Sequence, residues 1–511
     1  MIRLLILNFF LSLSLLSMAQ ERNIPQMVAN PILPGFNPDP SVCRVGDDYY
    51  LVTSSFAFYP GLPIYHSKDM VNWRLVGHAL SENNIGGFHF DGIGDNDGIW
   101  APTIRYNRGT FYISCTAWRS GGNFIITATD PAGPWSKPVW VPEASGIDPT
   151  LFFDDDGKCY YVGNRYDFKQ SWRGQVGIHI QEIALDTIVD GTVREKKAGI
   201  AFKAPTYRLK GENKIISYGH ASNASYAEGP HIYKINGIYY LLMAEGGSGA
   251  YHAVTVSQSK SLFGPYLPQQ VNPVLTHRHM GNRYPIQNIG HADIIQTQHG
   301  EWYAICLGNR MLPIPGNSNQ PYACPLGRET WLTPVAFQDG QLIFAPGVGR
   351  IDTLVCRPQL PWTPVAESKE QWYTPLTMPS LRLKKLTNHF WNYELAVSNS
   401  SAVEGIILFR TVNSYYSLIK TKKSVVLSKM AKGKLSVLTE VPSKSDKAIL
   451  RIQADGMRLQ FYCDGIQIGG EQSFLPLCDD RTYNKFNGTG VGYILIRKQE
   501  PTLQSLPPHR Q

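Results

Sequence analysis

Residues 226–241 read Tyr-Ala-Glu-Gly-Pro-His-Ile-Tyr-Lys-Ile-Asn-Gly-Ile-Tyr-Tyr-Leu, an outline that decides the fold because it recurs along the chain. Alternating apolar residues after the proline predict a β-strand, and Asn236-Gly237 predicts a tight turn into a second strand. The stretch is therefore interpreted as a β-hairpin with a carboxylate, Glu228, at its start.

The same outline occurs four more times, at residues 39–51, 101–113, 148–162 and 291–304. Five related hairpins predict the five blades of a β-propeller, in which each repeat supplies the inner strands of one small sheet. An acid before proline is common as a turn cap, and any one of them has that ordinary explanation. Three acids at matching positions of the repeats, Asp39, Asp148 and Glu228, instead favour one shared central site.

A second region follows a proline-containing linker. Short alternating segments at 393–397, 405–409, 415–419 and 490–496 predict the strands of a β-sandwich. We expect a signal peptide at 1–19, a propeller at 25–345, a linker at 346–364 and a sandwich at 365–500. No strand segment is evident between Leu383 and Trp391, which leaves the completeness of the sandwich open.

Composition and charge argue against a nucleic-acid-binding protein. The chain has 511 residues, 43% of them hydrophobic and 12% aromatic, and its formal charge is +8. Lys and Arg are scattered rather than gathered on a basic helix, so we do not expect a nucleic-acid partner. The eight cysteines form no CxxC or zinc-ligand spacing, and their pairing stays open.

The N-terminus carries an apolar run from Leu4 to Leu16, followed by Ser17-Met18-Ala19. This pattern predicts a secretory signal peptide cut after Ala19. The run is shorter than the ~20 residues that a membrane-spanning helix needs. We therefore expect an exported protein, periplasmic or secreted, with no membrane attachment after cleavage.

Six short motifs occur in a familiar order: residues 37–41 (Asn-Pro-Asp-Pro-Ser), 98–103 (Gly-Ile-Trp-Ala-Pro-Thr), 146–150 (Gly-Ile-Asp-Pro-Thr), 228–231 (Glu-Gly-Pro-His), 290–293 (Gly-His-Ala-Asp) and 327–330 (Gly-Arg-Glu-Thr). Together they resemble glycoside hydrolase family 43, in particular its β-xylosidases and α-L-arabinofuranosidases. The resemblance covers nearly the whole mature chain. It implies an all-β fold, a five-bladed β-propeller followed by a C-terminal lectin-like β-sandwich.

Glycoside hydrolysis needs a protonated acid for the leaving oxygen and an ionised carboxylate acting on the opposite face of the sugar. We assign Asp39 as general base and Glu228 as general acid. Asp148 is expected to raise the pKa of Glu228 by like-charge repulsion and to help position it. The resemblance implies the same three roles, and also inversion at the anomeric carbon without a covalent intermediate.

Five further residues are expected to bind substrate. The rigid donor fork of Arg328 suits sugar hydroxyls or a carboxylate, and the resemblance implies that Trp100 and Phe58 wall the sugar subsite. It also implies that His291 contacts the central site, in some members through water or calcium, so His291 is the candidate for a structural metal. In the resembled xylosidases one sandwich loop narrows the pocket entrance, and the resemblance therefore implies that Phe486, in the loop 478–489, lies at the pocket rim. No cofactor is expected to be required.

We expect release of terminal xylose from β-1,4-xylo-oligosaccharides. Because xylose and arabinofuranose present similar hydroxyl arrangements, α-L-arabinofuranosidase action on arabinoxylan is the alternative. A non-catalytic glycan-binding propeller would be expected to lack one of the acids, and none is missing. The oligomeric state is left open.

Overall fold

The computed structural model describes residues 26–195, 199–220, 225–281, 283–314, 316–317, 322–365, 371–400, 402–478 and 484–495. Within these ranges the chain forms β-strands and two short 3-10 helices, η1 (Ile85–Gly87) and η2 (Leu475–Leu477), and no α-helix. The predicted all-β fold is confirmed. The signal peptide expected at 1–19 lies outside the described residues, and the described part contains no helix of the length and apolarity needed to cross a membrane.

Each predicted hairpin forms the two inner strands of a four-stranded antiparallel blade. Blade one comprises β2 (Ser41–Val45), β3 (Asp48–Val52), β5 (Gly61–Ser67) and β6 (Arg74–Leu80). Blade two comprises β8 (Thr103–Asn107), β9 (Thr110–Trp118), β10 (Gly122–Ala128) and β11 (Val139–Trp140). Blade three comprises β12 (Thr150–Phe153), β13 (Cys159–Arg165), β14 (Gly177–Glu195) and β15 (Ile200–Ser217).

The last two blades follow the same plan. Blade four comprises β16 (Glu228–Ile235), β17 (Ile238–Glu245), β18 (Ala253–Ser259) and β19 (Leu267–Pro268), with β20 (Leu275–Thr276) also on β18. Blade five comprises β21 (Ile286–Gln296), β22 (Trp302–Arg310), β25 (Arg328–Gln338) and β26 (Gln341–Phe344). A separate short sheet pairs β23 (Leu312–Pro313) with β24 (Tyr322–Ala323).

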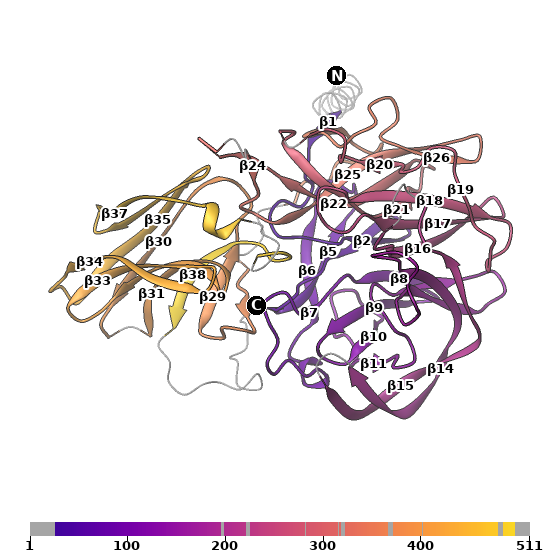
Figure 1. Ribbon diagram of the computed structural model, residues 1–511, viewed down its shortest axis with the longest axis horizontal. Coiled ribbons are helices and arrows are strands. Elements are labelled where there is room, and N and C mark those ends of the chain that lie inside the picture. The colour runs from indigo at the N-terminus through magenta and orange to yellow at the C-terminus, as the bar shows by residue number, and fades with distance from the viewer. Residues whose placement is uncertain are drawn as a thin grey trace, which may run out of the picture.

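The five blades close into a ring. The innermost strands contact one another in the order β2, β8, β12, β16 and β21, and β21 contacts β2 again. Outside the ring, β1 (Met27–Ala29) pairs with β27 (Leu354–Cys356), so the segments just before and just after the blades meet. Blades two and three are joined by pairing of Trp140 with Thr206, and β7 (Gly98–Ile99) adds to β9. Figure 1 shows these sheets around one centre on the right.

The orange and yellow part of Figure 1 is the predicted sandwich. One sheet has the strand order β29 (Leu381–Lys385), β38 (Gly490–Leu495), β31 (Val403–Thr411), β32 (Ser414–Lys420), β33 (Ser424–Ala431) and β34 (Lys434–Pro442). The other has the order β30 (Phe390–Ser398), β35 (Lys447–Asp455), β36 (Arg458–Cys463) and β37 (Ile466–Ser473). Only residues 386–389 separate β29 from β30, so no strand lies between them.

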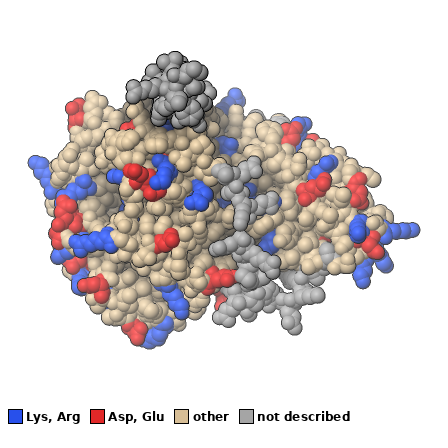
Figure 2. Space-filling view, turned by 180° about the vertical axis from the view of Figure 1, so that it is seen from behind, with Lys and Arg blue, Asp and Glu red and all other residues tan. Residues whose placement is uncertain are grey.

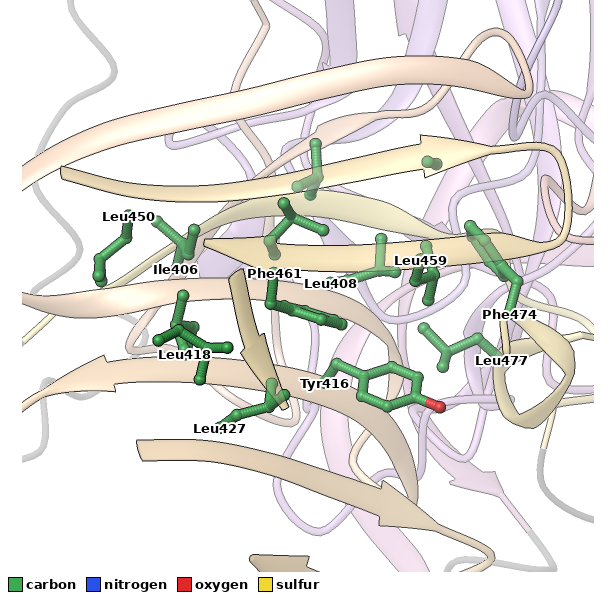
Figure 3. Close-up of a cluster of buried hydrophobic side chains, with 14 of the residues drawn as sticks. Ile406, Leu408, Tyr416, Leu418, Leu427, Leu450, Leu459, Phe461, Phe474 and Leu477 are labelled. Carbon is green, nitrogen blue, oxygen red and sulfur yellow. The ribbon is translucent and has the colours of Figure 1, made fainter. Parts of the chain in front are cut away.

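Alternating strand residues fill the space between the two sheets, as expected for side chains of period two. Figure 3 shows Ile406, Leu408 and Leu418 of one sheet facing Leu450 and Phe461 of the other. All five are fully buried. This core is separate from the cores between the propeller blades, so each part has its own hydrophobic interior.

Specific contacts join the sandwich to the propeller. β28 (Thr374–Pro375) pairs with β4 (Phe58–Tyr59), which lies between β3 and β5 of blade one in the chain. Arg410 of β31 is fully buried and donates to the carbonyl oxygens of Pro325 and Asn484. Asp95 of the propeller accepts a hydrogen bond from Thr377. Residues 484–489 of the sandwich are held against the propeller by Asn487, which donates to the carbonyl oxygen of Asp95 at 2.7 Å, and by Thr489, which donates to that of Pro325 at 2.6 Å.

Charged side chains are mixed over the surface. Figure 2 shows Lys and Arg interspersed with Asp and Glu on the face turned to the viewer, without a broad patch of one sign. All eight cysteines are free thiols, seven of them buried. A buried free thiol behaves as a small apolar side chain.

Candidate active site

The structure brings the three predicted acids together at the centre of the propeller. Asp39 and Asp148 precede β2 and β12 and are 4% and 6% exposed, whereas Glu228, at the start of β16, is partly exposed. The backbone N–H of Gly229 donates to Oδ2 of Asp148 at 3.2 Å, which joins the segments carrying Asp148 and Glu228. Residues far apart in the chain thus form one acidic cluster.

An unusual backbone conformation recurs at the repeat starts. Asp39, Asp148, Gly229 and His291 have φ values of 52°, 55°, 56° and 49°. Left-handed φ is uncommon for residues other than glycine and costs of order 1–3 kcal/mol, so it persists where the surrounding fold holds it. Glu228 is therefore one residue earlier than the position matching the two aspartates, which corrects the expected equivalence of all three acids.

Gly229 is required at the matching position in blade four. Besides the positive φ, a Cβ atom there would lie 3.0 Å from ring atoms of His291. Blade four therefore has no side chain at the position that matches Asp39 and Asp148. Its acid is the preceding residue, Glu228, whose side chain is longer than that of an aspartate. A register irregularity between Glu228 and His231 in the pairing of β16 with β17 accommodates the offset.

Asp39 is held by donors from distant parts of the chain. Nη1 of Arg328 donates to its Oδ1 at 2.7 Å, and the hydroxyl of Ser54 donates to its Oδ2. Nδ1 of His291 lies 3.9 Å from Oδ1. Both carboxylate oxygens therefore have fixed directions, as a residue that must orient a water molecule requires.

Burial raises the pKa values of the other two acids. The protein packed around the partly exposed Glu228 carboxyl desolvates it and, with the negative charge of Asp39, raises its pKa to about 7, although Arg328 and Lys485 oppose the shift. Burial, then the charges of Glu228 and Asp39, hold the pKa of Asp148 well above its usual range. The expected cause was repulsion by Asp148; the structure instead puts burial first and Asp39 next for Glu228.

An aromatic wall surrounds Arg328. Its guanidinium carbon lies 5.2 Å from the ring centre of Phe56 and 5.4 Å from that of Phe486, and these two rings are stacked at 5.6 Å. The Trp100 ring lies 5.7 Å from Phe486 and is stacked on Trp118 at 4.5 Å. Arg328, Trp100 and Phe486 thus occupy one site, and Phe486 comes from the sandwich.

Phe58 has different neighbours from those expected. Its ring packs edge-on against Phe36 at 5.8 Å and against a buried sandwich cluster that includes Leu383 and Phe409. The residue beside Arg328 is Phe56. The sequence pointed to the aromatic segment 56–64 but left core filling an equal alternative for Phe56, and it gave no signal for Ser54 or Trp118. Nothing in a local pattern shows which of these residues point toward the axis.

His291, the candidate for a structural metal, lies buried beside Asp39. His291 is 6% exposed, and burial lowers its pKa. Among the residues that the structure describes, no group of three or more His, Cys, Asp or Glu side chains is arranged to hold a metal ion. Calcium at His291 stays a prediction, and no step below depends on it.

The profile of Glycosyl hydrolases family 43 matches residues 28–342, the five blades and the acids at their centre. The chain belongs to this family. A xylosidase/arabinosidase of Butyrivibrio fibrisolvens is 44% identical over 326 residues, which cover 63% of this chain and 57% of that protein. A non-reducing end α-L-arabinofuranosidase of Bacteroides ovatus is 36% identical over 468 residues, 89% of this chain and 78% of the relative.

Solved structures of the family 43 enzymes also match both parts of the fold. A xylan β-1,4-xylosidase from Bacillus halodurans superimposes with a TM-score of 0.78 at 28% identity, covering 91% of this chain and 96% of the other. The chain thus spans nearly all of that two-part structure, but little more than half of the Butyrivibrio relative.

Proposed function

We propose that this protein is an exported glycosidase that removes terminal xylose from β-1,4-xylo-oligosaccharides by a single, inverting displacement. The observation that carries the proposal is the acid cluster: one carboxylate bonded to Arg328 and Ser54, and a second with its pKa raised to about 7. Two carboxyl groups in contrasting environments are what acid and base roles at one glycosidic bond require.

In the proposed reaction Asp39 accepts a proton from a water molecule whose oxygen attacks the anomeric carbon. The bond from that carbon to the glycosidic oxygen breaks, and Glu228 gives its proton to the departing oxygen. Asp148 holds the Gly229 backbone beside Glu228. Arg328 orients Asp39 through the bond from its Nη1. Protons and electron pairs balance without a cofactor.

Arabinofuranose release from arabinoxylan is the second candidate, supported by the names of the Butyrivibrio and Bacteroides relatives. A panel of aryl β-xylopyranoside, aryl α-L-arabinofuranoside, xylobiose and arabinoxylan tests both. Proton NMR of the first product tests the stereochemistry, and we expect the inverted anomer. Absence of hydrolysis across the panel would overturn the proposed function, and a retained anomer would overturn the single displacement.

Activity should fall as pH rises through about 7. Glu228 must carry a proton to act as acid, and its raised pKa keeps that proton up to neutral pH. Because Lys485 lowers this pKa, Lys485→Ala should move the alkaline limb of kcat/KM to higher pH. Lys485→Arg keeps the charge and serves as the control. Identical alkaline limbs in wild type and Lys485→Ala would contradict the assignment of the acid.

Phe486→Ala should raise the KM for xylobiose about tenfold, a free-energy change of about 1.4 kcal/mol. The variant removes a ring that packs on Arg328, Phe56 and Trp100 at the site. Because Phe486 is partly exposed, the midpoint of thermal unfolding should change little. Phe390→Ala, an exposed ring on β30, is the matched control. A large loss of stability with unchanged KM would assign Phe486 to packing alone.

A further inference from the structure

Exposed aromatic side chains are concentrated on one side of the propeller. Of the seven exposed aromatic residues within the described ranges, five lie between residues 166 and 251. Trp172, Tyr218 and Tyr226 are 42%, 40% and 46% exposed. We call these three the aromatic platform. Exposed rings gathered in one place mark a binding surface more often than rings scattered singly.

The platform rings lie on two loops that touch. Trp172 follows β13, and its ring lies 6.3 Å from that of Tyr218, which directly follows β15. The backbone N–H of Tyr226 donates to the carbonyl oxygen of Gly174 at 2.7 Å. A Cβ atom at Gly174 would lie 3.2 Å from the Tyr226 ring, which therefore covers this glycine.

The platform borders the proposed general acid. Tyr226 lies two residues before Glu228 and has a left-handed backbone, with φ of 54°. Asn164, on β13, donates to the carbonyl oxygen of Ala227 at 3.4 Å and accepts from the N–H of Ile147 at 2.7 Å. The segments that carry Asp148, Glu228 and Tyr226 are thus bonded together at one edge of the site.

We propose that the aromatic platform binds the β-1,4-linked xylosyl chain that leaves with the glycosidic oxygen. This rests on the proposed function, in which Glu228 protonates that oxygen, so the leaving chain departs on the Glu228 side. Aromatic faces stack on the apolar C–H faces of pyranose rings. The occupant is the same whether the released sugar is terminal xylose or an arabinofuranose branch, because both leave a xylosyl chain behind.

The test compares substrates with and without a leaving chain. For Trp172→Ala and Tyr218→Ala, kcat/KM on xylohexaose divided by kcat/KM on aryl β-xylopyranoside should fall about tenfold relative to wild type. Trp172→Phe should recover part of the ratio, because it restores an aromatic face. Phe390→Ala is the matched exposed-ring control and should leave the ratio unchanged.

Binding without turnover separates this proposal from the proposed function. In the Glu228→Gln background, calorimetry should show about tenfold weaker xylohexaose binding when Trp172→Ala is added. Unchanged xylohexaose affinity together with an unchanged ratio of the two kcat/KM values would overturn the proposal that the platform binds the leaving chain. If wild type hydrolyses no pentoside, the proposed function fails. Calorimetry with xylohexaose still shows whether the platform binds a xylosyl chain. A change in sedimentation without an effect on xylohexaose would assign the rings to self-association and overturn it.

Discussion

Asp39→Asn and Glu228→Gln should each lower kcat on xylobiose by about 10²–10⁴-fold, the usual contribution of general acid–base catalysis. The amide introduced by Asp39→Asn is too weak a base to take a proton from water. The amide introduced by Glu228→Gln is too weak an acid to give a proton to the leaving oxygen. Both changes keep the shape of the side chain. The amide at position 39 still accepts from one of Arg328 and Ser54, so the fold should remain intact.

The two variants should differ on an activated substrate. An aryl xyloside with a good leaving group needs little protonation, so Glu228→Gln should recover much of its activity there, whereas Asp39→Asn should not. The control is Glu182→Gln, which should match wild type. Glu182 lies on β14 and forms a surface ion pair with Lys158. Near-normal xylobiose turnover in either site variant, with thermal unfolding unchanged, would exclude the assigned role.

Asp293→Ala should lower the free energy of unfolding by about 3–5 kcal/mol, the cost of removing one partner from a buried ion pair. Asp293 is fully buried and pairs with Arg105 at 2.9 Å. It also accepts hydrogen bonds from the hydroxyls of Ser41 and Tyr233. Asp293 lies on blade five and its three partners lie on blades two, one and four, so the carboxylate joins four inner strands at the propeller axis.

Burial would raise the pKa of Asp293, but the positive charge of Arg105, together with the hydrogen bonds that Asp293 accepts from Tyr233 and Arg105, holds this pKa below its usual range. The ion pair between Asp293 and Arg105 should therefore persist in acidic solution. Denaturant unfolding of wild type and Asp293→Ala measures the loss. The control is Asp352→Ala, which breaks the exposed pair between Arg350 and Asp352 and should cost about 0–1 kcal/mol. Equal stability of the two variants would show that the axial cluster does not hold the blades together.

Local pattern was sufficient to predict the blades. Each hairpin combines an alternating apolar run with a turn, and four of the five also carry a proline at the start, within about 16 residues of sequence. Such short-range signals do not depend on the rest of the chain. The hairpin starting at Glu228 became β16 and β17, and the other four became the inner strands of their blades. The central placing of Asp39 and Asp148 followed from this, because radial repetition brings equivalent positions to one axis. Glu228 lies one residue before the equivalent position, an offset that the sequence reading did not predict.

The surroundings of those acids depend on contacts between residues hundreds of positions apart. Arg328 donates a hydrogen bond to Asp39, which is 289 residues away in sequence. It also donates to the carbonyl oxygen of Phe486, which is 158 residues away in sequence. No local sequence pattern shows that Phe56 rather than Phe58 lies beside that guanidinium. The two residues are only two positions apart, and the pairing of β4 with β28 is set by packing against the sandwich. Burial likewise raises the pKa of Glu228 to about 7. A carboxyl group loses its water only when distant segments pack around it, so this property belongs to the tertiary structure.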